Sequence, residues 1–375
     1  MDNDQPPQRE RSKMAAYLPP ELVREIMVRL PVKTLLRFRG ICKGWRDMIS
    51  DDAEFRGAHL RLQKPCLLAW SSTKEDRRNK VTTVGLYVPE ESAAITDTME
   101  LPLECESHSF AHCDGLLLMP TETVVRVVNP ATRHVLTLPE SSNSVAPKFC
   151  FDVFYTHQVF GIGHDPRSDT YTVVRFFFGS LDLLPTDAHR YNFGLEVFTI
   201  GVDRHWHETA VKPPYPADVG RTATFFKGSL FWIIDEEKLD EGESAPGFLR
   251  FRLEDESFSV TPPPPCCRGL KYTTSHMAEL RGELCVAHAG PKYDSIEIWM
   301  CNDVDINLPR WNRCYTFGPL FLSKDPTLIT YMYDRCQYLL VQQVLKDIVG
   351  IDIDLMHHDL DFVIRYTPSL GLLSS

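Results

Sequence analysis

Residues 16–55 read AYLPPELVREIMVRLPVKTLLRFRGICKGWRDMISDDAEF, and the interpretation of the whole chain starts from this stretch. Apolar residues recur in it at helical spacing, with Leu18, Leu22 and Ile26 four residues apart. Pro31 cannot lie inside a helix, because its ring clashes with the preceding turn. Two further apolar sets follow Pro31, the first at Val32, Leu35, Leu36 and Phe38 and the second at Ile41, Cys42, Trp45, Met48 and Ile49. The pattern therefore predicts about three short helices that fold back on one another.

A helical unit of this size is too small to bury a stable core alone, because chains below roughly 60 residues leave much of their apolar surface in water. Two interpretations follow. The helices can form a cap on the domain that comes after them, or one of their faces can receive a second protein. Spacing alone does not separate these alternatives.

The residues themselves favour the second interpretation, because the stretch resembles an F-box as plant F-box proteins carry it. The resemblance runs in order through Leu18 to Leu22, Ile26, Leu30-Pro31, Leu35 to Arg39, Cys42-Lys43, Trp45 and Ile49. It departs from the usual pattern at two glycines, Gly40 and Gly44. The resemblance implies docking on a Skp-family adaptor. The apolar set expected to build the F-box and its adaptor-binding surface is Leu18, Pro19, Leu22, Ile26, Leu30, Leu36, Phe38, Cys42 and Trp45.

Charge is distributed unevenly along the chain. Its 375 residues carry a formal net charge of −11, yet residues 1–64 hold 13 Lys/Arg against 9 Asp/Glu and the remainder holds 27 against 42. An acidic body without a basic stripe argues against nucleic-acid binding, which requires cations to displace counterions from phosphates. The basic N-terminal part suits an acidic protein partner, and Skp-family adaptors are acidic.

The sequence predicts an intracellular protein. Residues 1–14 are polar, and no apolar run approaches the ~20 residues that span a membrane. The 11 cysteines follow no disulfide framework, which is typical of reduced thiols. We therefore expect the nucleus, the cytoplasm or both, and no membrane partner.

From Pro65 onward, short β-prone runs alternate with turn residues, which predicts an all-β sandwich, barrel or propeller. A repeat selects the propeller. Gly115, Gly228 and Gly282 each open a strand after a turn, and the units recur at roughly 45–65 residues, near the period of kelch-type blades. We count about six units, each of which must be covered by its neighbours in a closed ring.

This second part resembles the F-box-associated domain of plant F-box proteins. The matching runs are Cys113 to Leu117, Asn129 to Arg133, Phe160 to Pro166, Tyr171 to Arg175, Gly228 to Trp232, Ile296 to Trp299 and Trp311. Val128 departs from the pattern, since a tryptophan usually stands there. The predicted organisation is a disordered tail (1–14), an all-α F-box (15–56), a connecting helix (57–64) and an all-β, kelch-like propeller (65–375).

Candidate sites for covalent chemistry are weak. The run from Phe160 to Gly163 lacks the third glycine of a phosphate loop, and we interpret it as a β-turn between strands. Cys105, His108, His112 and Cys113 have zinc-ligand chemistry, but Cys113 leads directly into an apolar strand and such closely spaced groups rarely reach tetrahedral geometry together. We predict no metal, no cofactor and no catalytic residue.

The resemblance implies an adaptor: the F-box binds a Skp-family protein, and through it a cullin, while the β domain holds an unidentified target for ubiquitination. Two alternatives stay open, a Skp-binding scaffold without ligase activity and a propeller enzyme with a helical appendage. For the target we expect long inter-strand loops to matter. The loop from Ser180 to Tyr191 carries Leu183 and Leu184, which a fully solvated loop does not need.

Overall fold

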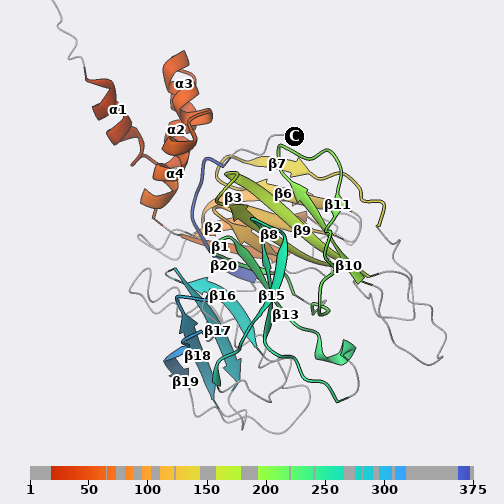
Figure 1. Cartoon of the computed structure of the whole chain (residues 1–375). Coiled ribbons are helices and arrows are strands. Elements are labelled where there is room, and N and C mark those ends of the chain that lie inside the picture. The colour runs from red at the N-terminus through yellow and green to blue at the C-terminus, as the bar shows by residue number, and fades with distance from the viewer. Residues whose placement is uncertain are drawn as a thin grey trace, which may run out of the picture.

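The computed structural model describes residues 18–64, 66–72, 81–87, 95–102, 110–121, 124–143, 158–178, 193–218, 221–239, 242–265, 275–280, 282–289, 295–305, 309–317 and 362–371. Four helices come first, and twenty strands follow (Figure 1). The helices are α1 (Pro20–Met27), α2 (Val32–Phe38), α3 (Lys43–Ser50) and α4 (Ala53–Leu62). A small all-α part therefore precedes an all-β domain, as the sequence predicts.

The helix ends follow from local chemistry. Pro20 occupies the first turn of α1, where its missing N–H group removes no hydrogen bond within the helix. Pro31 lies immediately before α2 and is its N-cap residue, and α1 already ends at Met27. Asp52 caps α4, since its carboxylate accepts a hydrogen bond of 2.8 Å from the Phe55 amide. Breaks at these points let the four short helices turn back on one another.

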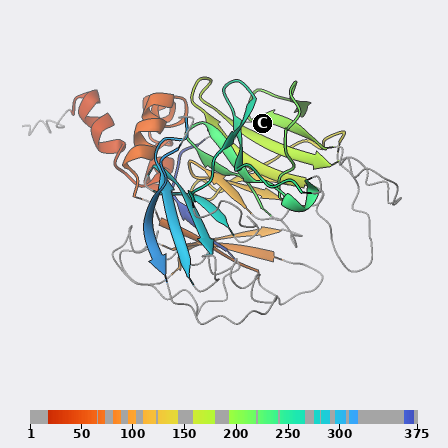
Figure 2. The same cartoon turned by 60° about the horizontal axis from the view of Figure 1, so that its bottom comes forward.

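The described strands form five antiparallel sheets of four strands each, arranged in a ring (Figures 1 and 2). In chain order the strands are β1 (Cys66–Ser72), β2 (Val81–Tyr87), β3 (Ile95–Pro102), β4 (Ala111–Cys113), β5 (Leu116–Pro120), β6 (Val125–Asn129), β7 (His134–Thr137), β8 (Gln158–Asp165), β9 (Thr170–Phe178), β10 (Phe193–Thr199), β11 (His207–Glu208), β12 (Thr224–Phe226), β13 (Ser229–Ile233), β14 (Phe248–Arg252), β15 (Ser257–Thr261), β16 (His276–Leu280), β17 (Glu283–Ala289), β18 (Ile296–Cys301), β19 (Asn312–Phe317) and β20 (Phe362–Tyr366).

The two ends of the β domain share one sheet, in the order β20-β1-β2-β3. Such pairing joins the last described strand to the first and so links the two ends of the β domain. These observations agree with a propeller-like domain. The predicted number of about six blades stays a prediction, because five sheets account for the described residues alone.

The glycines of the sequence repeat lie where the repeat places them. Gly115, Gly228 and Gly282 have φ of +78°, +70° and +78°, and each precedes the second strand of a sheet. Asp114 and Lys227 come directly before two of these glycines and are also left-handed, with φ of +47° and +44°. Two consecutive left-handed residues form the tight hairpin turn that matches the twist of antiparallel strands.

One prediction about the β domain is wrong. The run from Phe160 to Gly163 is no turn but lies inside strand β8. A Cβ on Gly161 would come within 2.7 Å of the Ala223 side chain, and one on Gly163 within 2.6 Å of Phe225. Both glycines are therefore needed because the next sheet packs closely against β8.

Tryptophan and proline pairs join neighbouring sheets. The indole N–H of Trp206 donates to the Pro139 carbonyl at 2.8 Å, and that of Trp311 donates to the Pro262 carbonyl at 2.9 Å. In both pairs the proline follows the outer strand of the preceding sheet. These tryptophans and prolines thus meet between adjacent blades, where each half-buried indole N–H has a carbonyl acceptor.

The residues after β20 are held against the β4–β7 sheet. The Asn129 amide donates to the carbonyls of Ser369 and Gly371 at 3.2 and 3.0 Å, and its oxygen accepts from the amides of Ala131 and Thr132. The backbone also passes so close to Gly115 that a Cβ there would lie 2.3 Å from the Thr367 oxygen. Asn129 therefore fastens the C-terminal segment onto the ring.

Replacing Asn129 with alanine should lower the free energy of unfolding by roughly 1–3 kcal/mol, because buried amides and carbonyls lose their partners. Chemical denaturation measures this change, and hydrogen exchange of residues 366–371 should accelerate. Asn143→Ala provides an asparagine control, since Asn143 bonds to Glu196 and Glu208 instead. Unchanged exchange of the C-terminal segment in Asn129→Ala would contradict this assignment.

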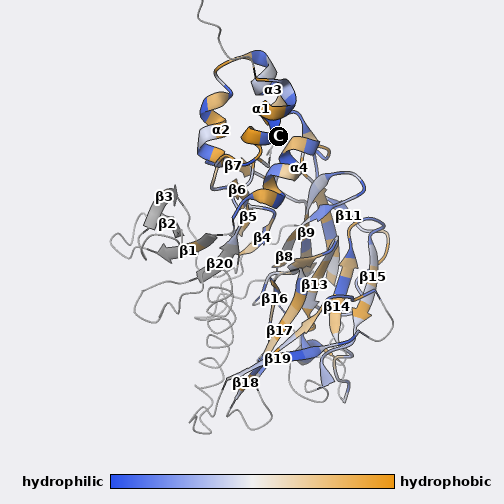
Figure 3. Ribbon diagram, turned by 90° about the vertical axis from the view of Figure 1, so that its left-hand side faces the viewer, coloured by the Kyte–Doolittle hydropathy of each residue, from blue (hydrophilic) through white to orange (hydrophobic). Residues whose placement is uncertain are grey.

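The helices lie at one end of the ring and share a core with it (Figure 3). Met27, Leu35 and Phe55 of the helical part are buried in the same cluster as Leu117 and Tyr366 of the β domain. Burial of such large side chains contributes about 1.5–3 kcal/mol each. Among the described helices, none has the length and apolarity to cross a membrane.

Candidate functional site

The four helices divide their apolar residues between a buried and an exposed side. Met27, Val28, Val32, Leu35 and Ile49 are buried. His59 of α4 is also buried and bonds through its Nε2 atom to the Leu30 carbonyl at 2.9 Å, which ties α4 to the turn between α1 and α2. Burial lowers the pKa of His59, so the neutral ring is the favoured form. The helices therefore bury one side against one another and against the β domain.

On the opposite side, a stripe of large apolar residues is open to solvent. Leu18, Leu22 and Ile26 are 51%, 51% and 50% exposed. Leu22 and Ile26 stand four residues apart on one face of α1, and Leu18 lies just before the N-cap residue Pro19. Single exposed apolar residues are ordinary, but three at this spacing along one short segment form an apolar surface. We call Leu18, Leu22 and Ile26 the α1 stripe.

The predicted F-box set separates into two groups in the structure. Leu18, Pro19, Leu22, Ile26 and Cys42 are exposed. The other members are half-buried and pack against the shared core: Leu30, Leu36, Phe38 and Trp45. Of these, the Phe38 and Trp45 rings lie 5.3 Å apart between α2 and α3. The second group is thus partly structural.

Sequence reasoning placed Ile41 within a helical apolar set, but it lies in the turn between α2 and α3 and is 61% exposed. The sequence did contain a signal for this turn, because Ile41 directly follows Gly40, the residue that breaks the helical pattern. Ile41 extends the exposed apolar surface of this part of the chain beyond the α1 stripe.

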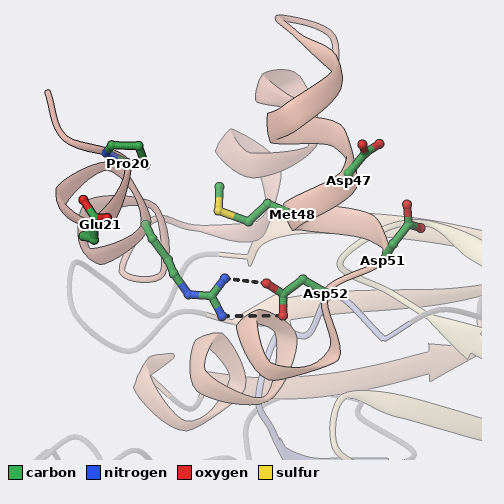
Figure 4. Close-up of a pocket in the computed structure, with 7 residues that line it drawn as sticks. Pro20, Glu21, Asp47, Met48, Asp51 and Asp52 are labelled. Atoms are coloured by element: carbon green, nitrogen blue, oxygen red, sulfur yellow. Dashed lines mark hydrogen bonds and ion pairs between the residues drawn. The ribbon is translucent and has the colours of Figure 1, made fainter. Parts of the chain in front are cut away.

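A groove of about 620 Å³ separates α1 from α3 (Figure 4). Met48 and Pro20 line it together with four carboxylates, those of Glu21, Asp47, Asp51 and Asp52. Asp52 forms an ion pair with Arg24 across the groove, and its bond to the Arg24 guanidinium lowers the pKa of the Asp52 carboxyl. The same carboxylate caps α4, so Asp52 links α1 to α4.

Positive charge gathers on the surface of α2 and α3. Arg29, Lys33, Arg37, Lys43 and Arg46 are exposed there. Arg29 forms an ion pair of 2.7 Å with Glu25. An exposed i,i+4 ion pair of this kind stabilises a helix by a few tenths of a kcal/mol. The helical part therefore combines an apolar stripe with exposed cations, a composition suited to an acidic partner.

The predicted target-binding residues Leu183 and Leu184 lie outside the described residues. Of the zinc-ligand candidates, Cys105 and His108 also lie outside them, whereas Cys113 is buried in β4 beside the half-buried His112. Within the described ranges, no three His, Cys, Asp or Glu side chains gather where they could share a metal ion.

The β domain contains a serine–histidine pair that sequence reasoning missed. The Ser275 Oγ and His288 Nδ1 atoms are 2.9 Å apart, although 13 residues separate them in the chain. Ser275 is 0% and His288 2% exposed, and burial lowers the pKa of His288 to about 4. A substrate has no access to a pair buried this deeply, so the pair is part of the core.

Comparison with known proteins identifies both parts. The F-box domain family matches residues 17–56, and the F-box associated beta propeller domain family matches residues 77–370. An F-box/LRR-repeat protein from Arabidopsis thaliana is 24% identical over 88% of this chain and 77% of its own length. Another F-box protein from the same plant is 23% identical over 94% of this chain and 86% of its own length.

Solved structures resemble the chain only distantly. An apocarotenoid oxygenase from Synechocystis is 12% identical over 67% of this chain and 62% of its own, at a TM-score of 0.34. That likeness carries no argument about this chain.

Proposed function

Because this chain belongs to the plant F-box proteins that carry an F-box-associated β-propeller domain, we propose that it is the substrate-recognition subunit of an SCF-type (Skp–cullin–F-box) ubiquitin ligase. In this role the helical part docks on a Skp-family adaptor, and the β domain holds the protein to be modified. The chain contributes no covalent chemistry. Holding the target beside the ubiquitin-transfer machinery raises the effective concentration of its lysines.

The observation that carries this proposal is the α1 stripe. Its three large side chains are half-exposed, although the same helix buries Met27 and Val28 in the core. Because about half of each stripe residue is already buried, transferring the remaining surface from water into an interface would contribute about 0.8–1.5 kcal/mol per side chain. The exposed cations of α2 and α3 would add attraction to an acidic adaptor at long range.

Co-expression with a Skp-family adaptor tests the proposal. We expect the two chains to purify together and, after addition of the cullin and ubiquitin-transfer proteins, ubiquitin to be attached to captured proteins. Adaptor binding without any ubiquitin transfer would favour a scaffold. Failure to bind any Skp-family adaptor would contradict the proposal.

A further inference from the structure

A second cavity, of about 320 Å³, lies at the joint between the helical part and the ring. Helix α4 forms one wall with Arg56 and Gly57. The β4–β5 turn and the β8–β9 hairpin form the other wall with Asp114, His164 and Tyr171, and the C-terminal segment held by Asn129 completes it. With Ile200 to Val202 after β10, the cavity is therefore built from five segments that are distant in sequence.

Several polar groups in this cavity lack full partners among the described residues. Among the described residues, the Asp114 carboxyl interacts with the Cys113 thiol, a weak donor, and burial raises the pKa of Asp114. No described residue hydrogen-bonds to the Tyr171 hydroxyl. Arg56 uses one N–H group on the Ser50 carbonyl, at 2.6 Å, which leaves the rest of its guanidinium available. Pockets with a few convergent polar groups of perturbed pKa are the usual ligand sites of proteins.

The hairpin itself does not require an acidic residue at position 114. Lys227 occupies the same place in the β12–β13 turn, with nearly the same φ and a glycine after it. A lysine therefore satisfies the turn as well as an aspartate does. The turn therefore does not require the carboxylate of Asp114.

The charges of the two walls decide which ligand fits. Arg56 on α4 would repel a simple cation, whereas Asp114 on the ring would repel a simple anion. Asp169 also lines this wall, but its carboxylate is already paired with the His164 Nε2 atom at 2.9 Å. A molecule with both charges can place its amine toward the ring and its carboxylate toward α4. The Tyr171 ring, whose centroid lies 5.1 Å from that of His164, adds an aromatic surface on the amine side, where cations are attracted to ring faces.

We propose that this cavity binds a small zwitterion of the amino-acid class, with its amine on Asp114 and Tyr171 and its carboxylate on Arg56. Because such a ligand touches both α4 and the ring, it stabilises the folded chain, and the stabilisation grows with the logarithm of its concentration over its dissociation constant. The inference does not depend on adaptor binding or ligase activity.

The experiment adds each of the twenty standard amino acids singly to the full chain and measures the melting temperature and the dissociation constant by calorimetry. At least one amino acid should raise the melting temperature. Its decarboxylated amine and its N-acetyl derivative, which lack one charge each, should bind about tenfold more weakly or worse. The proposal is overturned if no amino acid binds, or if both derivatives bind as well as the parent.

Substitutions of residues that line the cavity test whether the ligand binds there. Asp114→Asn and Arg56→Gln should each weaken binding by about tenfold or more, because each removes one charge-assisted hydrogen bond. If those variants fail to fold, Gly57→Leu provides a second test of where the ligand binds. A Cβ on Gly57 would meet nothing closer than 3.6 Å, so the leucine should enter the cavity, block the ligand and leave α4 intact. Undiminished binding by Gly57→Leu would assign the ligand to another place.

Discussion

Replacing Leu22 and Ile26 together with aspartate should abolish capture of the Skp-family adaptor while the β domain melts as in the wild type. Both residues are half-exposed on the α1 stripe, so the change leaves the core in place. The interface would lose roughly 1.5–3 kcal/mol of apolar burial and would acquire two carboxylates whose desolvation costs further free energy. Such a loss weakens binding by more than about a hundredfold, which pull-down and calorimetry both detect.

Val211→Asp is the matched control, because Val211 is 58% exposed but belongs to the ring. It should leave adaptor capture unchanged. Leu36→Asp is less informative, since Leu36 is half-buried against the shared core and its substitution would also disturb the fold. If the Leu22 and Ile26 double variant captured the adaptor at the wild-type level, the α1 stripe would have no part in docking.

Replacing Arg175 with methionine should lower the free energy of unfolding of the β domain by about 3–5 kcal/mol. The Arg175 and Glu196 side chains form an ion pair and are only 3% and 2% exposed. Glu196 also accepts hydrogen bonds from Ser141 and Asn143, and the Arg175 guanidinium lies 5.4 Å from the centre of the Trp206 ring. Without Arg175, the Glu196 carboxylate stays buried with neutral donors alone, and this cost is large.

Two further variants test whether the loss of stability comes from leaving a charge buried and unpaired or from losing an ion pair as such. Arg29→Met breaks the exposed pair with Glu25, whose side chains are 59% and 65% exposed, and should change stability by less than about 1 kcal/mol. Adding Glu196→Leu to Arg175→Met should recover part of the stability, because the unpaired charge is then gone. Denaturant titration measures all three. Equal losses in Arg175→Met and Arg29→Met would contradict the burial argument.

Local sequence features predicted the helices and the hairpin turns of this protein well. Pro20 and Asp52 act on backbone groups within a few residues, so their effects are visible in the sequence. The same holds for the glycines of the β-repeat, whose left-handed backbone is set by the turn that contains them. Each of these interactions has both partners inside one short segment.

The run from Phe160 to Gly163 shows where local reasoning fails. Glycines usually mark turns, and the sequence was interpreted that way. Here Gly161 and Gly163 lie in a strand, because the side chains of Ala223 and Phe225 leave no room for a Cβ. Those neighbours come from another sheet about sixty residues later, and only the packing of the sheets brings them to β8.

The sequence by itself determined that a small helical part precedes a repetitive β domain, because residue order and spacing carry that information directly, and its resemblance to known F-boxes indicated the family. The tertiary structure decided which apolar residues of the F-box face solvent, since exposure depends on how α1 packs against α2, α3 and α4. It also brought Asn129 to the C-terminal segment and Asp114 to α4. These contacts join residues that are far apart in the sequence. They form only when the chain folds, so local sequence patterns do not reveal them.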